Sequence, residues 1–212
     1  MVIYTAIYGE HDVLHEPTHD FPLDIELVCF TDQPLESERW EIRRDVSWHE
    51  SAAAAKWFKM RPHVLFPDDD LTLYLDGNMQ PRAACVELPD LYHDAELVTY
   101  QHPERPGWHL EAVACIQRGK VEPKSMMRQM DRYAAAKLDP CGGLYNGGFL
   151  LRRNTHAMTV FNELWWGECS RYTMRDQVSL PYVLRKMCGT IRHEVIDGSI
   201  YHSRYAQWWG HV

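Results

Sequence analysis

The sequence lacks the features that mark membrane-spanning and secreted proteins. None of its apolar runs approaches the roughly 18 residues that a membrane-spanning helix needs. The opening segment, MVIYTAIYGEHD, has neither a basic region nor a long apolar core, so it predicts a strand and not a signal peptide. The six cysteines are scattered without any CxxC pair, which favours free buried thiols over disulfides. We therefore expect a cytoplasmic protein with no membrane span.

Positive charge is also scarce. The chain has 22 Lys and Arg residues against 30 Asp and Glu residues, which gives a formal net charge of -8. Proteins that bind duplex nucleic acid usually carry a basic face, so the sequence gives no strong nucleic-acid signal. The Gly-x-Ser-x-Gly elbow of serine hydrolases is absent, and a zinc hydrolase is not expected either.

The residues that are present fit one globular domain. The 212 residues are 45% hydrophobic and 25% charged, so we expect a single domain over residues 1–212. Apolar runs that end at turn residues predict strands at 2–9, 26–32, 40–45, 71–75 and 96–100. Helical patterns cover 50–66, 109–119, 124–137, 155–168 and 175–187, and Pro62 is expected to split the first of them. Alternating strands and helices predict an α/β domain with a mostly parallel central sheet flanked by helices.

The clearest candidate for a binding site is Asp76-Gly77-Asn78, directly after the strand at 71–75. In open α/β sheets, ligands bind beyond the carboxyl ends of the strands. Carboxylate and amide oxygens suit Mg or Mn, and such an ion neutralises the charge on a diphosphate leaving group. The alternative is a simple turn, because Asp-Gly is a common turn dipeptide.

Three other groups could contact an anionic ligand. The segment from Gly142 to Gly148 has four glycines, which permit close backbone approach to a ligand, although a flexible loop is the alternative. Asp176 opens a helix, where an acid is often only a cap. Lys56 and Lys59 share one helix and could face phosphates, although a solvated cationic face is the usual explanation.

In their order and spacing, these segments resemble one family, the DUF616 family, which is also called the TOD1/MUCI70 glycosyltransferase-like domain. The resemblance is carried by IYTAIYGEHDVL, VCFTD, AAAAKWFKMRPHVLFP, LTLYLDGNMQ, QHPERPGWHLEAVACIQRGK, LYNGGFLLRRNT and RDQVSLPYVLRK. The family looks like a GT-A type glycosyltransferase. The resemblance therefore implies a Rossmann-like sheet with a donor site at the ends of the central strands.

Individual residues of this chain match the motifs of the family. The matched motifs are Leu75-Asp76-Gly77, His102 with Arg105, Glu111-Ala112 and Arg175-Asp176-Gln177. Asn78 stands where a typical GT-A enzyme has the second acid of its Asp-x-Asp motif. The implied reaction is the transfer of a sugar from a nucleotide-sugar donor to a hydroxyl of an unidentified glycan, lipid, protein or modified nucleic acid, with Mn or Mg as the cofactor.

The resemblance and the motifs together predict a role for each candidate residue. We expect the nucleoside to be held by the loop from Thr5 to Gly9 and by Asp32. The predicted donor site comprises Thr5, Ala6, Tyr8, Gly9, Asp32, Lys56, Lys59, Asp76, Gly77, Asn78, His102, Asn146, Gly147 and Gln177. The predicted metal ligands are Asp76, Asn78 and His202. The predicted catalytic residues are Asp176 or Glu111 as general base, with Arg105 and Arg175 to stabilise the leaving group.

Two alternative functions remain open. One is a nucleotide-sugar-binding protein without transfer activity, which Asn78 in place of an acid would suit. The other is a hydrolase of lipid amides, an activity that the resemblance also suggests.

Overall fold

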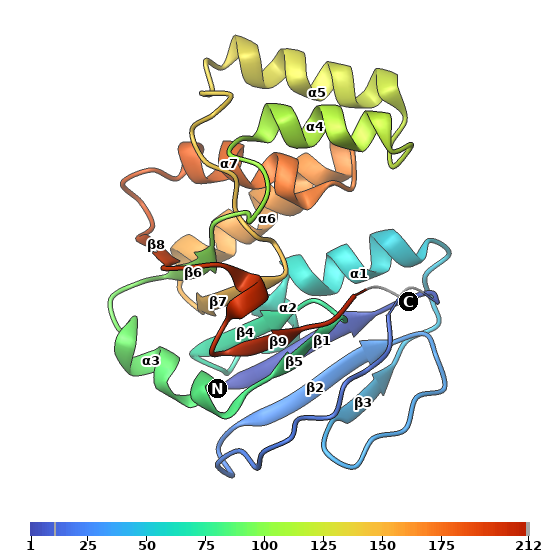
Figure 1. The fold of residues 1–212 in the computed structure, drawn as a ribbon, viewed down its shortest axis with the longest axis vertical. Coiled ribbons are helices and arrows are strands. Elements are labelled where there is room, and N and C mark those ends of the chain that lie inside the picture. The colour runs from blue at the N-terminus through green and yellow to red at the C-terminus, as the bar shows by residue number, and fades with distance from the viewer. Residues whose placement is uncertain (11, 211–212) are drawn as a thin grey trace.

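A seven-stranded sheet in the order β3-β2-β1-β4-β7-β6-β8 forms the centre of the computed structural model (Figure 1), which describes residues 1–10 and 12–210. The strands are β1 Val2–Ile7, β2 Glu26–Thr31, β3 Glu41–Arg44, β4 Leu71–Leu75, β6 Leu97–Tyr100, β7 Phe149–Arg153 and β8 His193–Ile196. All neighbouring pairs are parallel except those that involve β7, which runs antiparallel to β4 and β6. The predicted α/β class with a mostly parallel sheet is confirmed.

Except for α3, which no predicted segment covers, the helices follow the predicted segments closely. They are α1 Ser51–Met60, α2 Pro62–Leu65, α3 Leu88–Leu91, α4 Trp108–Gln117, α5 Pro123–Ala135, α6 His156–Arg171 and α7 Asp176–Lys186. Pro62 separates α1 from α2 as predicted, because its ring cannot continue the preceding helix. The prediction of one domain extends to residues 211–212, which lie outside the described residues.

The two faces of the sheet carry different cores. In β1, Tyr4 and Ala6 face the side on which α1 and α6 lie. The core on this side continues to α7 and to α4 and α5, which stack farther from the sheet (Figure 1). Ile3 and Ile7 face the opposite side, where they pack with side chains from the segments after β4 and near the carboxyl end of the chain. Both faces of the central strands are thus buried, which explains why the strands are continuous apolar runs.

A second, two-stranded sheet lies against the carboxyl end of β4. Its strands, β5 Met79–Pro81 and β9 Ala206–Trp208, pair antiparallel, and Met79 lies opposite Trp208. The 3-10 helices η1 Ala83–Glu87 and η2 Ile200–His202 adjoin these strands. Neither short strand is predicted from the sequence, because three residues are too few for a periodic pattern to be recognised.

The segment from 101 to 145, which carries α4 and α5, leaves the sheet after β6 and returns to it before β7. Its two ends are joined by backbone hydrogen bonds from His102 to the Leu144 carbonyl (2.7 Å) and from Asn146 to the Tyr100 carbonyl (2.8 Å). The Thr99 hydroxyl adds a bond to the Asn146 carbonyl (2.5 Å). These bonds form a neck at the base of the segment. The segment is also held by α4 and α5, whose side chains share a core with α6 and α7, and by the ion pair of Arg132 with Glu168.

No helix within residues 1–10 and 12–210 combines the length and the apolar character that crossing a membrane would require.

Gly107 provides a test of the packing beside this neck. A Cβ atom at Gly107 would lie 1.9 Å from the Pro140 carbonyl oxygen, whereas a Cβ atom at Gly167 inside α6 would meet nothing within 4 Å. We expect Gly107→Ala to lower the free energy of unfolding by about 2 kcal/mol or more, because backbone must shift. Gly167→Ala should raise it by about 0.5–1 kcal/mol through helix propensity. Urea unfolding measures both, and equal effects of the two substitutions would contradict this packing.

Candidate functional site

A cavity of about 470 Å³ lies beyond the carboxyl ends of β1 and β4, between α1, α4, α7 and β9. Two other hollows in the described part of the chain have similar volumes, about 520 and 490 Å³. Charge distinguishes the first cavity, because twelve of its 25 lining residues are ionisable Asp, Glu, Lys, Arg or His. These residues are Asp12, Lys56, Lys59, Asp76, His102, Glu104, Arg105, Glu111, Arg118, Lys120, Arg175 and Asp176.

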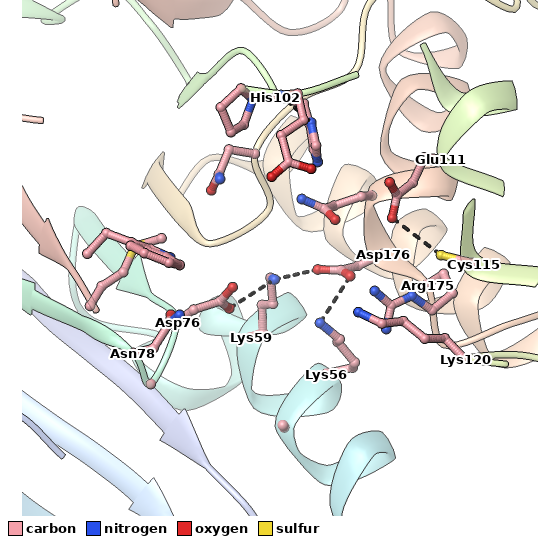
Figure 2. A pocket seen from close by; sticks show the side chains of 18 of the residues that line it. Lys56, Lys59, Asp76, Asn78, His102, Glu111, Cys115, Lys120, Arg175 and Asp176 are labelled. Carbon is pink, nitrogen blue, oxygen red and sulfur yellow. Dashed lines mark hydrogen bonds and ion pairs between the residues drawn. The ribbon is translucent and has the colours of Figure 1, made fainter. Parts of the chain in front are cut away.

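The floor of the cavity is built around the buried ammonium group of Lys59, whose side chain is only 1% exposed. Its Nζ donates to Asp76 Oδ1 at 3.2 Å and also bonds Asp176 Oδ2 (Figure 2). Burial alone would lower the pKa of Lys59, but the carboxylates of Asp176 and Asp76 outweigh it, so the pKa is raised. Lys59 is therefore charged at neutral pH.

Asp176 is held as an anion by two lysines. Its Oδ1 lies 3.0 Å from Lys56 Nζ, and its Oδ2 bonds Lys59. Burial opposes ionisation of Asp176, yet Lys56, Lys59 and Arg175 together hold the pKa of this carboxyl far below its ordinary value. The same balance, with burial opposed chiefly by Lys59 and Lys56, lowers the pKa of Asp76.

Arg152 on β7 fixes the end of α1 that presents Lys59. Its buried guanidinium donates to the Lys59 carbonyl oxygen at 2.6 Å and to the Tyr4 hydroxyl at 2.6 Å. The Tyr4 hydroxyl donates to the same carbonyl at 3.0 Å. Carbonyls in the last turn of a helix lack helical partners and favour a nearby cation, so Arg152 stabilises this terminus. Arg152 thereby positions Lys59, although the sequence alone gives no reason to include Arg152 in the site.

Two glycines make room for the carboxylates. A Cβ atom at Gly147 would lie 2.8 Å from Asp176 Oδ2, and one at Gly148 would lie 2.6 Å from Asp76 Oδ2. Gly148 is adjacent to Asp76 because β7 pairs antiparallel with β4, and the Asp76 amide donates to the Gly148 carbonyl at 2.8 Å. The reversed direction of β7 thus brings the glycine segment to the carboxyl end of β4.

The opposite wall comes from α4 and the loop before it. Arg105 bonds Glu111 through its Nε and Glu104 through its Nη1, at 3.1 Å for the latter. The other Glu111 oxygen accepts from Cys115 Sγ at 3.3 Å. The backbone amides of Glu104 and Arg105 both donate to His102 Nδ1 at 3.1 Å, which leaves Nε2 of the neutral ring as a donor. Burial lowers the pKa of His102 and thereby favours this neutral form.

Positive charge without a carboxylate partner gathers at one end of the cavity. Within residues 1–10 and 12–210, Arg118, Lys120 and Arg175 form no ion pair within 4.0 Å. The Nε atom of Arg175 is buried and has no hydrogen-bond partner in the part of the chain that the structure describes. Figure 2 shows Arg175 and Lys120 on the side of the cavity opposite Asp76 and Asn78. A buried donor without a partner and two further free cations are suited to bind an anion.

The predicted metal ligands do not form one set of ligands. Asp76 is bonded to Lys59, and the Asn78 side-chain amide donates to the Trp209 carbonyl at 2.9 Å. The third predicted ligand, His202, does not line the cavity. No group of three or more His, Cys, Asp and Glu residues suited to hold a metal ion occurs in the described residues, 1–10 and 12–210. The side chains present therefore do not fit an ion held by three protein ligands.

The structure brings most of the predicted site residues to this cavity. The residues that line it are Ala6, Lys56, Lys59, Asp76, Gly77, Asn78, His102, Arg105, Glu111, Asn146, Arg175, Asp176 and Gln177. Gly147 lies directly behind Asp176. Thr5 and Tyr8 are buried away from the lining, and Gly9 donates its amide to the Asp32 carboxylate at 3.1 Å. The predicted nucleoside-binding loop thus contacts the cavity through Ala6.

Several lining residues are missing from the predicted set. They are Asp12, Glu104, Arg118, Lys120, Tyr201 and Trp208, among others. Tyr201 and Trp208 come from the aromatic tail, whose composition is the one signal that could have identified them. Arg118 and Lys120 follow the end of α4, and nothing local distinguishes them from solvated surface cations.

His15, Glu16 and His19 form a His-Glu-x-x-His sequence, a formal match to the zinc-hydrolase motif that the chain was not expected to carry. In zinc hydrolases this motif lies on a helix, which places both histidines on one face. Here the segment is irregular and contains Pro17. The His15 ring stacks on Trp209 with ring centroids 4.9 Å apart. The match therefore has no zinc-hydrolase geometry.

Comparison with known proteins gives three findings. The sequence profile of the TOD1/MUCI70 glycosyltransferase-like domain matches residues 32–197. The probable hexosyltransferase MUCI70 of Arabidopsis thaliana is 24% identical over 217 residues, which cover 88% of this chain and 37% of the relative. A solved "glycosyltransferase involved in the glycosylation of the major capsid of PBCV-1" aligns with 12% identity and a TM-score of 0.40, over 74% of this chain and 65% of that one.

The chain spans less than two thirds of the length of either protein. The family profile, by contrast, covers well over half of the chain and includes the Asp76, Glu111 and Asp176 segments. The chain therefore belongs to the TOD1/MUCI70 glycosyltransferase-like domain family.

Proposed function

We propose that this protein is a glycosyltransferase that moves a hexosyl or pentosyl unit from a nucleotide-sugar donor to a hydroxyl acceptor. The observation that carries the proposal is the separation of charge within one cavity. Arg118, Lys120 and Arg175, which form no ion pair within 4.0 Å among the described residues, occupy one end. The ionised Asp176 lies between this end and the ionised Asp76 on the opposite side. Glycosyl transfer develops negative charge on the leaving diphosphate and positive charge on the sugar ring, so this layout complements its transition state.

The diphosphate is assigned to the cationic end. Arg175 and Lys120 would contact the phosphate oxygens directly, and Lys56 would add a third positive charge. Mn or Mg was the predicted source of this charge. Because Asp76 is bonded to Lys59 and the Asn78 amide is bonded to the Trp209 carbonyl, we assign the neutralisation of the leaving group to the cations of the chain itself.

Asp76 is assigned to the transferred sugar. Its side chain is 36% exposed, whereas that of Asp176 is 4% exposed, so Asp76 is the floor carboxylate that a substrate can reach. Its lowered pKa keeps it ionised at neutral pH. An anion at this place stabilises the positive charge that develops on the sugar ring and accepts hydrogen bonds from its hydroxyls.

Asp176 and Glu111, the two predicted general bases, are assigned positioning roles. Both oxygens of each carboxylate are already bonded, in Asp176 to Lys56 and Lys59, and in Glu111 to Arg105 and Cys115. A base works best when its pKa is near the working pH, and the pKa of Asp176 lies far below it. These acids therefore hold the cations of the site in place.

The first test measures binding of UDP, GDP, dTDP and CMP by isothermal titration. We expect at least one nucleotide to bind, and to bind in EDTA as well as in Mg. Lys120→Gln should weaken that binding about five- to tenfold, because one charged contact to phosphate is lost. Lys124→Gln is the matched control, since Lys124 is an exposed lysine that does not line the cavity, and it should have no effect. Binding that EDTA abolishes would contradict the assignment of the diphosphate to protein cations.

The second test measures release of the nucleoside diphosphate from the nucleotide sugar that binds. Asp76→Asn should lower kcat by about 100-fold or more while the nucleotide Kd changes less than about threefold, because the lost charge acts on the reacting sugar. Wild-type protein that binds the donor without hydrolysis or transfer would instead support the binding-protein alternative. Release of fatty acid from a lipid amide, with no nucleotide binding, would support the hydrolase alternative.

The third test measures stability against pH for Asp176→Asn. The lowered pKa of Asp176 stabilises the fold at neutral pH, and this stabilisation is lost as the pH falls below the ordinary aspartate pKa of 3.8. We expect the substitution to cost about 3–5 kcal/mol at pH 7, because it leaves buried lysine charge without its partner. The difference from wild type should shrink on acidification.

Glu87→Gln is the control for this third test, because Glu87 pairs with Arg204 at the surface and its loss should cost at most about 1 kcal/mol. An Asp176→Asn variant that keeps wild-type stability at every pH but loses turnover would contradict the positioning role and restore Asp176 as the general base.

A further inference from the structure

An aromatic pair forms one edge of the cavity at the end that carries Asp76. The rings of Tyr201 and Trp208 meet edge to face with centroids 4.9 Å apart, and both residues line the cavity. Tyr201 is 41% exposed and Trp208 is 39% exposed. Large aromatic side chains that remain this accessible at a cavity edge provide flat apolar surface for a ligand.

Asn78 holds this edge in place. Its side-chain amide donates to the Trp209 carbonyl at 2.9 Å, and the Trp209 amide donates back to the Asn78 carbonyl at 2.9 Å. Together with the pairing of β5 and β9, which sets Trp208 opposite Met79, these bonds attach the aromatic segment to the turn that carries Asp76. The pair is thus fixed before any ligand arrives, so little conformational entropy is lost when it binds one.

Polar groups border the aromatic pair. The Tyr201 hydroxyl donates to Glu104 Oε1 at 3.1 Å, while Glu104 Oε2 bonds Arg105. His102, whose Nε2 is a donor, lines the same cavity. A flat apolar face surrounded by hydrogen-bonding groups is complementary to a sugar ring, which presents C–H groups on its faces and hydroxyls around its edge. A lipid chain would instead require a continuous apolar lining.

We propose that Tyr201 and Trp208 form the binding platform for a saccharide acceptor, so that the substrate of this protein is a glycan. The inference rests on the proposed function, because it places the acceptor beyond Asp76 and away from the cations assigned to the diphosphate. Figure 2 shows Asp76 and Asn78 at the opposite side of the cavity from Lys120 and Arg175, with Lys59 and Lys56 between them. A donor sugar that extends from the cations toward Asp76 would therefore approach an acceptor on the platform.

Trp209 offers a matched control for the platform. It adjoins Trp208 in the sequence and is 40% exposed, nearly the same as Trp208, but it does not line the cavity and its ring stacks on His15. Replacement of either residue removes one exposed indole from the same segment. Only the replacement of Trp208 alters the proposed platform.

The experiment titrates cellotetraose, xylotetraose, mannotetraose and chitotetraose into the full chain, with and without the nucleotide that binds best, and follows tryptophan fluorescence and heat. We expect at least one saccharide to bind. Trp208→Leu should weaken that binding about tenfold or more, Trp208→Phe should restore most of it, and Trp209→Leu should change it less than about twofold. The affinity for nucleotide should stay within about twofold in all three variants. Circular dichroism and the melting temperature establish that each variant is folded.

Each opposing outcome is distinct. If Trp208→Leu weakens nucleotide binding and leaves saccharide binding unchanged, the platform stacks a nucleobase and the inference is wrong. It is also wrong if no saccharide binds under either condition, or if Trp208→Leu and Trp209→Leu have equal effects. Saccharide binding through Trp208 in a protein that binds no nucleotide would sustain the platform and overturn the proposed function alone.

Discussion

The site depends on one buried charge, the ammonium group of Lys59. A cation removed from water is costly unless opposite charges and hydrogen bonds surround it closely. Asp76 and Asp176 supply those charges from two distant parts of the chain, and they lie close to Lys59 because Gly147 and Gly148 leave the space that side chains would fill. Arg152 fixes the backbone of Lys59 by a hydrogen bond to its carbonyl oxygen. The need to stabilise the buried ammonium group of Lys59 therefore explains why two carboxylates, two glycines and an arginine lie around it.

The same arrangement separates two kinds of carboxylate by their access to solvent. Asp176 is enclosed and fully engaged with lysines, whereas Asp76 remains open to the cavity. Two acids, each from a different motif, thus acquire different uses from their surroundings, since burial and partners decide what a titratable group can do. Asn78 has a role that differs from those of Asp76 and Asp176. Its amide fastens the aromatic segment, which a carboxylate could not do because it has no hydrogen to donate to the Trp209 carbonyl.

The sequence predicts most strands of the main sheet and the long helices because these elements are strongly patterned, but it does not predict β8 or α3. It identifies Asp76, His102, Arg105, Glu111, Asn146 and Asp176 as residues that gather at one cavity, through strand ends, turn residues and a family resemblance. It does not predict how they pair. Lys59 and Asp176 are 117 positions apart, and their contact arises only when α1 and α7 pack on the same face of the sheet. Local patterns contain no signal for such a contact.

The short strands β5 and β9 escape prediction for a related reason. They exist because they pair with each other and not because either has a strong preference of its own. Arg152 is equally inconspicuous, since an arginine within an apolar strand normally indicates an exposed edge. Its partners, a helix carbonyl, the Tyr4 hydroxyl and the Asn162 side chain, become visible only in three dimensions.

The neck that closes the segment from 101 to 145 has a consequence for how this architecture can vary among relatives. The segment supplies one whole wall of the cavity. It joins the sheet at this neck, and the inner faces of α4 and α5 share a core with α6 and α7. The loops at 101–107 and 118–122 carry several of the lining residues, and they can change in length or composition while the strands and the packed faces of α4 and α5 remain unchanged. Substrate preference can therefore change in evolution while Lys59 and its partners Asp76 and Asp176, which all lie outside this segment, stay the same.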